Sequence, residues 1–303
     1  MAGAIIFDKD FDPYYGNVVE VCPGVRRVTA PNPSPMTFRG TNSYIVGERD
    51  LVIIDPGPDD DAHIEALLSA VARATVSHIV ITHTHRDHTS AVAKMVEATG
   101  AATVGGGPHR PARPPRNGEN IRLDASGDAS FHPDITLGDG DTISGSTWRL
   151  EAVATPGHTA NHLAFALDDG ETLFSGDHVM GWSTTIVAPP DGAMRDYLAS
   201  LDKLAARTEQ RFLPGHGAPI DDARSFVDAL KRHRKAREAA ILERLAAGDR
   251  TIPEIVSAVY HDTSPQLHRA AGLSVLAHLE DLVASGKILC DGPPVVEGCY
   301  WPA

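Results

Sequence analysis

The chain has 303 residues, of which 42% are hydrophobic and 22% charged, as in a globular protein of two domains or of one large domain with an appendage. No run of about 18 apolar residues occurs, which excludes a membrane-spanning helix, and a net charge of −13 argues against a protein that coats nucleic acid. Three cysteines without CxxC spacing, and an N-terminus without the pattern of a secretory signal, favour a cytoplasmic protein.

The first two-thirds of the chain alternate short β-branched runs with turn residues and helical patterns. The predicted strands cover residues 51–55, 78–82, 148–154, 162–167 and 171–174. Helices are indicated where apolar residues recur every three or four positions, over residues 61–74, 89–99 and 194–207. Mixed strands and helices in this order predict layered sheets with helices outside, an α+β fold.

Residues 105–120 interrupt this order with four prolines and a high content of arginine. This composition predicts an exposed loop rather than a regular element. Two interpretations remain open: a basic flap that contacts an anionic substrate, and a surface insertion. The second is the simpler one and is favoured.

A change of composition near residue 221 marks the predicted start of a second part. Residues 224–247 are expected to form one long helix, whose middle carries a run of basic side chains: Lys231, Arg232, Arg234, Lys235 and Arg237. Thr251 and Glu254 then form a capping box at the start of a short helix. Ser264, followed by proline, opens a longer helix.

The end of the chain completes this second part with a hairpin, predicted over residues 288–290 and 295–301. Helix, helix, hairpin is the order of a winged-helix module. We therefore expect a catalytic domain at residues 1–220, and a linker helix with a winged-helix-like domain at residues 221–303.

One short segment concentrates metal-binding side chains directly after a buried strand; it is Thr82-His83-Thr84-His85-Arg86-Asp87-His88. His83 and His85 are two apart in extended chain, so their side chains leave the same face, and Asp87 and His88 follow where the next helix begins. Alone, Asp87 would be interpreted as a helix N-cap and any histidine as a satisfied core or surface residue. Four such residues within six positions predict a metal site, for which zinc, iron and manganese are the candidate ions.

Three later segments share one format, in which a strand is followed by a glycine turn and a residue able to bind metal. These segments are Thr155-Pro156-Gly157-His158, Ser175-Gly176-Asp177 and Leu213-Pro214-Gly215-His216. Glycine permits the sharp turns that bring side chains to a crowded centre. Each segment alone is a weak signal, but together with the first cluster they predict one shared site.

These segments, with the strand that ends at Ile54-Asp55-Pro56-Gly57, resemble the metallo-β-lactamase superfamily over roughly residues 15–220. The resemblance implies an αββα sandwich, within the α+β class, that holds two Zn²⁺ ions at one edge of its sheets. The ligands that it implies are His83, His85 and His158 for the first ion, and Asp87, His88 and His216 for the second. Asp177 would bridge the ions, and Asp55 would orient ligands.

Two details narrow the resemblance. No cysteine lies near a ligand segment, whereas the true β-lactamases of the superfamily use a cysteine ligand, so antibiotic hydrolysis is not expected. The all-His/Asp set is similar to that of glyoxalase II and the ribonuclease branches. Segments at residues 32–36, 40–44 and 175–181, and the tail around residues 276–288, resemble a subgroup with a C-terminal winged helix, which includes a single-strand endoribonuclease and bacterial hydrolases or thioesterases.

In the mechanism that this resemblance implies, a hydroxide that bridges the two metals attacks a carbonyl carbon or a phosphorus atom. Asp87 or Asp177 would orient the hydroxide. An alkoxide leaving group needs a proton, whereas a thiolate leaves without one. His162, four residues after His158, is the candidate general acid, and its alternative interpretation is a polar residue that starts a strand.

The favoured function is hydrolysis of a small ester or thioester. The chain is acidic, and only 6% of its residues are aromatic, which is few for stacking on RNA bases.

The alternative is cleavage of single-stranded RNA, guided by the basic helix and the arginine-rich loop, although a charge run is usually a solvated helix face. The third hypothesis is a DNA-binding regulator, but residues 251–303 carry two basic against six acidic residues, a net charge of −4. We expect that module to form a packing wall of the active site or a homodimer contact.

Overall fold

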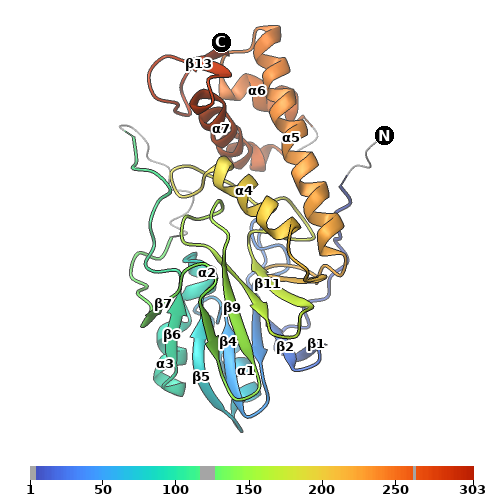
Figure 1. Cartoon of the computed structure of the whole chain (residues 1–303), viewed down its shortest axis with the longest axis vertical. Coiled ribbons are helices and arrows are strands. Elements are labelled where there is room, and N and C mark those ends of the chain that lie inside the picture. The colour runs from blue at the N-terminus through green and yellow to red at the C-terminus, as the bar shows by residue number, and fades with distance from the viewer. Residues whose placement is uncertain (1–4, 117–126, 262–263) are drawn as a thin grey trace.

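The computed structural model describes residues 5–116, 127–261 and 264–303. Two β-sheets pack together in one half of the molecule, and the end of the chain forms a largely helical unit at the other (Figure 1). Among the helices of these described ranges, none combines the length and the apolar character that crossing a membrane requires.

Within the described residues, the first sheet has seven strands in chain order, β1 to β7. Neighbours from β1 to β4 pair antiparallel, and those from β4 to β7 pair parallel. The strands are Val19–Cys22, Val25–Thr29, Asn42–Val46, Asp50–Ile54, Thr75–Val80, Ala102–Gly105 and Ile135–Thr136. The connections after β4 and β5 contain the helices α1 (Asp61–Val71), α2 (Arg86–Thr89) and α3 (Val92–Thr99).

The second sheet has the order β12-β11-β10-β9-β8, and all its neighbours pair antiparallel except β11 and β12, which are parallel. Its strands are Thr142–Ser144 (β8), Arg149–Ala154 (β9), Leu163–Leu167 (β10), Thr172–Gly176 (β11) and Arg211–Pro214 (β12). Helix α4 (Met194–Ala205) connects β11 to β12 and allows them to run parallel.

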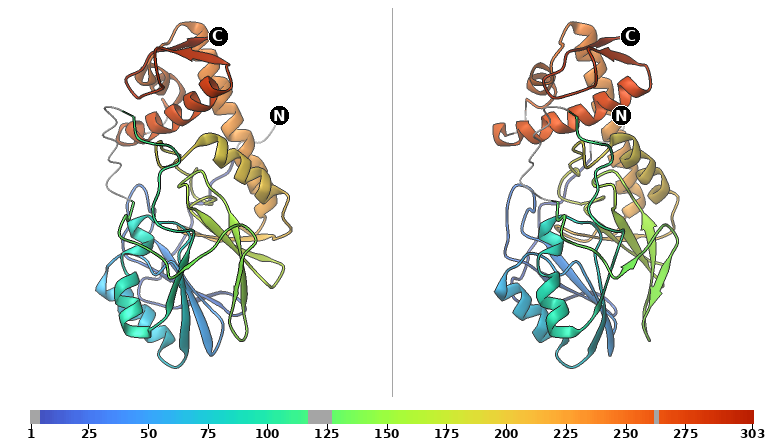
Figure 2. Two further views of the ribbon diagram at one scale, coloured as in Figure 1. Left: turned by 60° about the vertical axis from the view of Figure 1, so that its left-hand side comes forward. Right: turned by 90° about the vertical axis from the view of Figure 1, so that its left-hand side faces the viewer.

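The side chains of β4 show why the layers stack as they do. Val52 and Ile54 belong to the cluster between the sheets, together with Phe165 of the second sheet. Leu51 and Ile53 belong to the opposite cluster, beneath α1 and α3, because successive side chains of a strand point to opposite faces. A third cluster lies between the outer face of the second sheet and α4. Figure 2 shows the resulting four layers, which confirm the predicted αββα sandwich.

The C-terminal unit has the predicted order of helix, helix and hairpin. Its elements are α5 (Ala223–Ala247), α6 (Ile252–Val259), η1 (Pro265–Leu267), α7 (His268–Ala284), β13 (Ile288–Cys290) and β14 (Tyr300–Pro302). The capping box at Thr251 is present. Helix α5 contributes Val227 and Leu230 to the cluster beneath α4, and Ile241 and Leu245 to the cluster of the C-terminal unit. The domain boundary near residue 221 stays a prediction.

The hairpin is shorter than the sequence pattern predicts. Its second strand begins at Tyr300, where a strand from residue 295 was expected. The reason is a turn before it, in which the N–H of Gly298 donates to the carbonyl oxygen of Val295 at 3.0 Å.

The arginine-rich loop connects the two halves of the molecule. Residues 106–116 contain no helix or strand, as predicted, and residues 117–120 of the predicted loop lie outside the described residues. The favoured interpretation as a simple surface insertion is not supported. Arg113 Nη2 and Arg116 Nη1 each lie 2.6 Å from Oε1 of Glu280, a residue of α7. The loop therefore joins the sandwich to the C-terminal unit.

Candidate metal centre

The predicted metal ligands follow strands whose C-terminal ends meet at one edge of the sandwich. The HxHxDH segment follows β5, His158 follows β9, Asp177 follows β11 and His216 follows β12. The structure brings all of them together in two groups, which are His83, His85, His158 and Asp177, and Asp87, His88 and His216. Within each group the candidate ligand atoms lie within 4.8 Å of one another.

Three imidazoles of the first group point at one another. Nδ1 of His85 lies 3.0 Å from Nε2 of His83 and 3.0 Å from Nε2 of His158. Oδ2 of Asp177 lies 3.9 Å and 3.8 Å from the same two Nε2 atoms. Nitrogen ligands about 2.0–2.1 Å from a tetrahedral zinc ion stand about 3.3 Å apart. The spacing of these donors therefore fits one zinc ion.

Asp177 also contacts the second group. Nε2 of His216 lies 3.2 Å from Oδ2 of Asp177 and 3.2 Å from Oδ2 of Asp87. Nε2 of His88 lies 3.4 Å from Oδ2 of Asp87 and 3.6 Å from Oδ1 of Asp177. The carboxylate of Asp177 thus stands between the two groups, where a bridging ligand has to be.

Asp55 and Thr82 orient two of the histidines. Oδ2 of Asp55 accepts hydrogen bonds from Nδ1 of His88 at 2.9 Å and from the hydroxyl of Thr82 at 2.7 Å. The Thr82 oxygen in turn accepts from Nδ1 of His83 at 3.0 Å. A neutral histidine that donates through Nδ1 keeps its lone pair on Nε2, so these bonds leave the Nε2 atoms of both rings for metal binding. Asp55 has a φ of 51°, which is strained for a residue other than glycine.

Backbone carbonyl groups orient the other two Nε2 donors. Nδ1 of His158 donates to the carbonyl oxygen of Ile186 at 2.7 Å, and Nδ1 of His216 donates to that of Gly40 at 3.1 Å. Thr41 donates its hydroxyl proton to Oδ2 of Asp87 at 3.2 Å. The sequence assigned no role to Ile186, since a carbonyl group has no side-chain signal. Thr41 lies in the segment at residues 40–44 that carried the resemblance, where its role could have been suspected.

Gly215 allows the loop after β12 to approach the centre. A Cβ atom at this position would lie 2.4 Å from Oδ1 of Asp177 and 2.8 Å from Cε1 of His88. Any other residue would therefore displace a candidate ligand. This is the close approach that the glycine turns of the sequence predict.

The charges of the cluster set the protonation states of its members. Burial lowers the pKa of His83 well below its usual value and that of His85 to about 3. Burial also acts to lower the pKa of His216, but the carboxylates of Asp177 and Asp87 outweigh it and raise the pKa to about 10. Burial alone would raise the pKa of Asp177, yet His216 and His88 hold it well below its usual range. The first group thus offers neutral imidazoles and an ionised carboxylate, as metal binding requires.

The residues present fit a two-metal centre. Nε2 of His88 and Oδ1 of Asp177 are buried and have no hydrogen-bond partner among the described residues, although buried polar atoms are normally satisfied. Imidazole and carboxylate are ligands of zinc and also suit iron and manganese. Metal binding by this centre, and the identity of the ion, stay predictions.

His162 does not occupy the position of a general acid. Its side chain is buried, with an exposed fraction of 1%. Nε2 accepts a hydrogen bond from the backbone N–H of Asp177 at 3.2 Å, and Nδ1 lies 2.8 Å from the hydroxyl oxygen of Thr155. Burial and the neighbouring His178 and His158 hold its pKa well below the usual value. With both nitrogens engaged, His162 supports the loop of Asp177, which agrees with the alternative structural interpretation.

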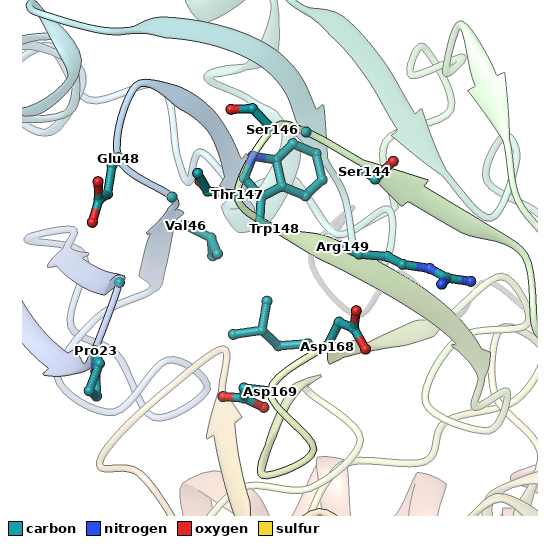
Figure 3. A pocket seen from close by; sticks show the side chains of 14 residues that line it. Pro23, Val46, Glu48, Ser144, Ser146, Thr147, Trp148, Arg149, Asp168 and Asp169 are labelled. Carbon is teal, nitrogen blue, oxygen red and sulfur yellow. The ribbon is translucent and has the colours of Figure 1, made fainter.

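A separate pocket lies at the other end of the sheets. It has a volume of about 510 Å³ and is bordered by the turns that precede β4, β9 and β11. Figure 3 shows Glu48, Arg149 and Asp168 around it. None of the predicted site residues lines this pocket, so it is not part of the candidate centre.

Comparisons with known proteins agree with the fold and with the site. The model of the Metallo-beta-lactamase superfamily matches residues 36–216, and that of the Beta-lactamase associated winged helix domain matches residues 251–292. The chain is 31% identical over 283 residues to the Beta-lactamase-like protein 2 homolog of Drosophila melanogaster, which covers 89% of this chain and 91% of that protein.

Two further likenesses extend over most of the chain. The Atrochrysone carboxyl ACP thioesterase dmxR1 of Cryptosporiopsis sp. (strain 8999) is 27% identical over 295 residues, covering 91% of this chain and 84% of that protein. The crystal structure of a metallo-beta-lactamase family protein from Thermus thermophilus has a TM-score of 0.73 at 25% identity, over 94% of this chain and 100% of that one. The chain therefore belongs to the metallo-beta-lactamase superfamily and carries a beta-lactamase-associated winged helix domain.

Proposed function

We propose that this hydrolase uses two zinc ions to cleave a thioester of a small acyl group. The observation that carries the proposal is the position of Asp177 between two groups of histidine and aspartate donors. Two bound zinc ions would lower the pKa of a water molecule towards neutrality and would polarise the carbonyl group of the substrate. Hydrolysis then adds water across the bond between the acyl carbon and the sulfur, giving a carboxylic acid and a thiol.

The chain's own carboxylates differ in their access to substrate. The side chain of Asp87 has an exposed fraction of 26%, against 9% for Asp177. Thr41 donates to Oδ2 of Asp87 and fixes the carboxylate in place. Asp87 is therefore the carboxylate that can orient the attacking water, while the buried Asp177 holds the two ligand groups together.

The surroundings of His162 favour a thioester over an ordinary ester. An alkoxide leaving group has to be protonated as it departs, whereas a thiolate is stable without a proton. His162, the acid that the sequence suggested, is turned away from this task by its bonds to Asp177 and Thr155. The name of the ACP thioesterase among the relatives supports the same class of reaction.

Three exposed arginines lie close in the chain to residues of the centre. Arg86 stands between His85 and Asp87, and Arg39 precedes Gly40, whose carbonyl oxygen binds His216. Arg110 donates to the carbonyl oxygen of Ala160, two residues beyond His158. A local positive charge in a chain of net charge −13 favours an anionic substrate, such as an acyl thioester whose thiol part carries phosphate.

The basic helix gives the endoribonuclease alternative less support than its sequence suggested. Lys231 lies 2.6 Å from Asp202, and Arg237 donates to the carbonyl oxygen of Val259 at 2.8 Å. Arg234 is buried. These three cations bind within the chain, so they are not displayed for a phosphate backbone.

A matched activity assay tests the proposal. Zinc-loaded protein is offered an acyl-CoA, S-lactoylglutathione, a neutral thioester and a labelled single-stranded RNA, with the double variant His83→Ala/Asp177→Ala as control. We expect thioester hydrolysis that the double variant lacks, with a higher kcat/KM for acyl-CoA than for the neutral thioester. Cleavage of RNA without turnover of any thioester would contradict the proposal and support the endoribonuclease alternative.

A further inference from the structure

Arg234 is a buried arginine in a helix whose basic side chains were expected to be exposed to solvent. It lies in α5 beside Lys231, Arg232, Lys235 and Arg237, yet its exposed fraction is only 2%. Its Nη2 donates to the carbonyl oxygen of Thr185, and its guanidinium carbon lies 5.0 Å from the ring centroid of Tyr197. A buried charge is costly unless hydrogen bonds compensate it. The partner of the guanidinium, the carbonyl group of Thr185, therefore indicates what the residue does.

The bond of Arg234 holds a two-residue segment that contacts two candidate metal ligands. The hydroxyl of Thr185 lies 2.7 Å from the backbone oxygen of Asp177 and 3.0 Å from that of His178. The next carbonyl group, of Ile186, accepts the hydrogen bond from Nδ1 of His158. Residues 185–186 thus hold the backbone of the bridging carboxylate and the ring of a histidine at once.

Tyr197 closes the same network from α4. Its side chain is fully buried, and its hydroxyl donates to the backbone oxygen of His178 at 3.2 Å. The Arg234 guanidinium therefore packs on a ring that is itself bound to the loop of Asp177. Arg234 thus contacts both Thr185 and Tyr197, and each of these residues is hydrogen-bonded to the loop that carries Asp177.

We propose that Arg234 is a positioning residue of the metal centre. It fixes residues 185–186, and through them it sets the orientation of the His158 ring and of the Asp177 backbone. Without this donor, the segment is free to turn, and the imidazole of His158 loses the partner that keeps Nε2 directed at His85. Groups that orient ligands in this way tune metal affinity although they do not touch the ion.

The proposal gives the C-terminal addition a role in the centre. Helix α5 carries Arg234 and continues to Ile241 and Leu245, which belong to the core of the winged-helix unit. The packing of that unit therefore determines where the guanidinium stands. The inference rests on the proposed metal centre and is independent of the substrate.

Arg237 provides a matched comparison three residues further along α5. Its Nη1 donates to the carbonyl oxygen of Val259, and its guanidinium carbon lies 4.7 Å from the ring centroid of Tyr260. The chemistry is that of Arg234, a carbonyl group and a tyrosine ring, but these partners lie at the end of α6. A general loss of packing would affect both arginine variants, whereas a positioning role affects one.

The experiment compares zinc affinity in Arg234→Met and Arg237→Met. Affinity is measured by competition with a chromophoric chelator, the Co²⁺-substituted proteins are compared by their visible spectra, and thermal unfolding is followed without metal. We expect Arg234→Met to bind zinc on the order of 10- to 100-fold more weakly than the unmodified chain and to change the Co²⁺ spectrum. Arg237→Met is expected to keep both properties even if its thermal stability falls.

Two results would overturn the proposal: zinc affinity in Arg234→Met equal to that of the unmodified chain, or the same loss of affinity in both variants. If Arg234→Met does not fold, Thr185→Val carries the test, because it removes the hydroxyl beside the Asp177 carbonyl group at nearly constant volume. The same weakening of zinc binding is expected, and unchanged affinity would again contradict the inference. An unmodified chain that binds no zinc would instead contradict the metal centre itself.

Discussion

Asp55 shows at the scale of one residue how the centre is held. Its Oδ1 accepts from the backbone N–H of Thr82 at 2.8 Å, and its Oδ2 accepts from both the Thr82 hydroxyl and Nδ1 of His88. Asp55→Asn keeps the shape and tolerates the positive φ, but it replaces one accepting oxygen with an NH2 group and removes the negative charge that favours the His88 N–H. We expect zinc affinity to fall on the order of 10- to 100-fold.

The control for Asp55→Asn is Asp60→Asn, which removes the same charge at the N-cap of α1, where asparagine caps equally well. Zinc bound by each variant is measured by competition with a chelator. Equal affinity in both variants would show that Asp55 does not act on the centre.

The site residues that the sequence could predict are those that offer a metal ligand from their own side chain. His83, His85, Asp87 and His88 stand within six positions, a density that is unusual unless a metal is bound. Thr185 and Arg234 could not be predicted, because they act through backbone carbonyl groups that every sequence presents. The sequence left His162 open between a general acid and a polar residue that starts a strand, because its spacing from His158 cannot show that its nitrogens contact Asp177 and Thr155.

At the scale of elements, the interface between α5 and α7 is predicted to weaken in acid. His278 of α7 is 1% exposed, and burial followed by the charges of Arg234, His233 and Arg237 lowers its pKa to about 3. The group is neutral in the folded chain and binds a proton in the unfolded chain once the pH falls below about 6.5. Its contribution to stability is therefore present above that pH and is lost as the pH falls towards 3.

The measurement for His278 is the free energy of unfolding against pH, for the unmodified chain and for His278→Leu, both without metal. When the pH is lowered from 7 to 5, the unmodified chain is expected to lose about 2 kcal/mol more of its free energy of unfolding than the variant loses. Parallel curves over that range would mean that another group carries the acid sensitivity of the interface.

The elements that could be predicted were those with an apolar pattern of their own. The observed ends lie within about three residues of the expected ones for the strands β4, β5 and β9 to β11 and for the helices α1, α4 and α5. β3 was not predicted as a strand, because Asn42 and Ser43 are polar and yet fully buried. Asn42 satisfies this burial with bonds to the carbonyl oxygens of Pro214 and Gly217, partners about 170 residues away that a local pattern cannot reveal.

At the scale of the whole molecule, the C-terminal unit is tied to the sandwich by charged groups. Arg113 and Arg116 reach Glu280 in α7, and Arg234 reaches the loop of Asp177 from α5. The sequence predicted a winged-helix module at this end of the chain and left open whether it forms a wall of the active site or a homodimer contact. The contacts within one chain show that the unit packs against the sandwich, whereas the active-site wall and the homodimer both stay predictions.

The most direct test of the two-metal centre is the number of zinc ions bound per chain, measured by elemental analysis of purified protein and compared with Asp177→Ala. Asp177 contacts both donor groups. We therefore expect two zinc ions in the unmodified chain and the loss of at least one in the variant. A chain that binds one ion or none when zinc is in excess, or a variant that still binds two with unchanged affinity, would contradict it.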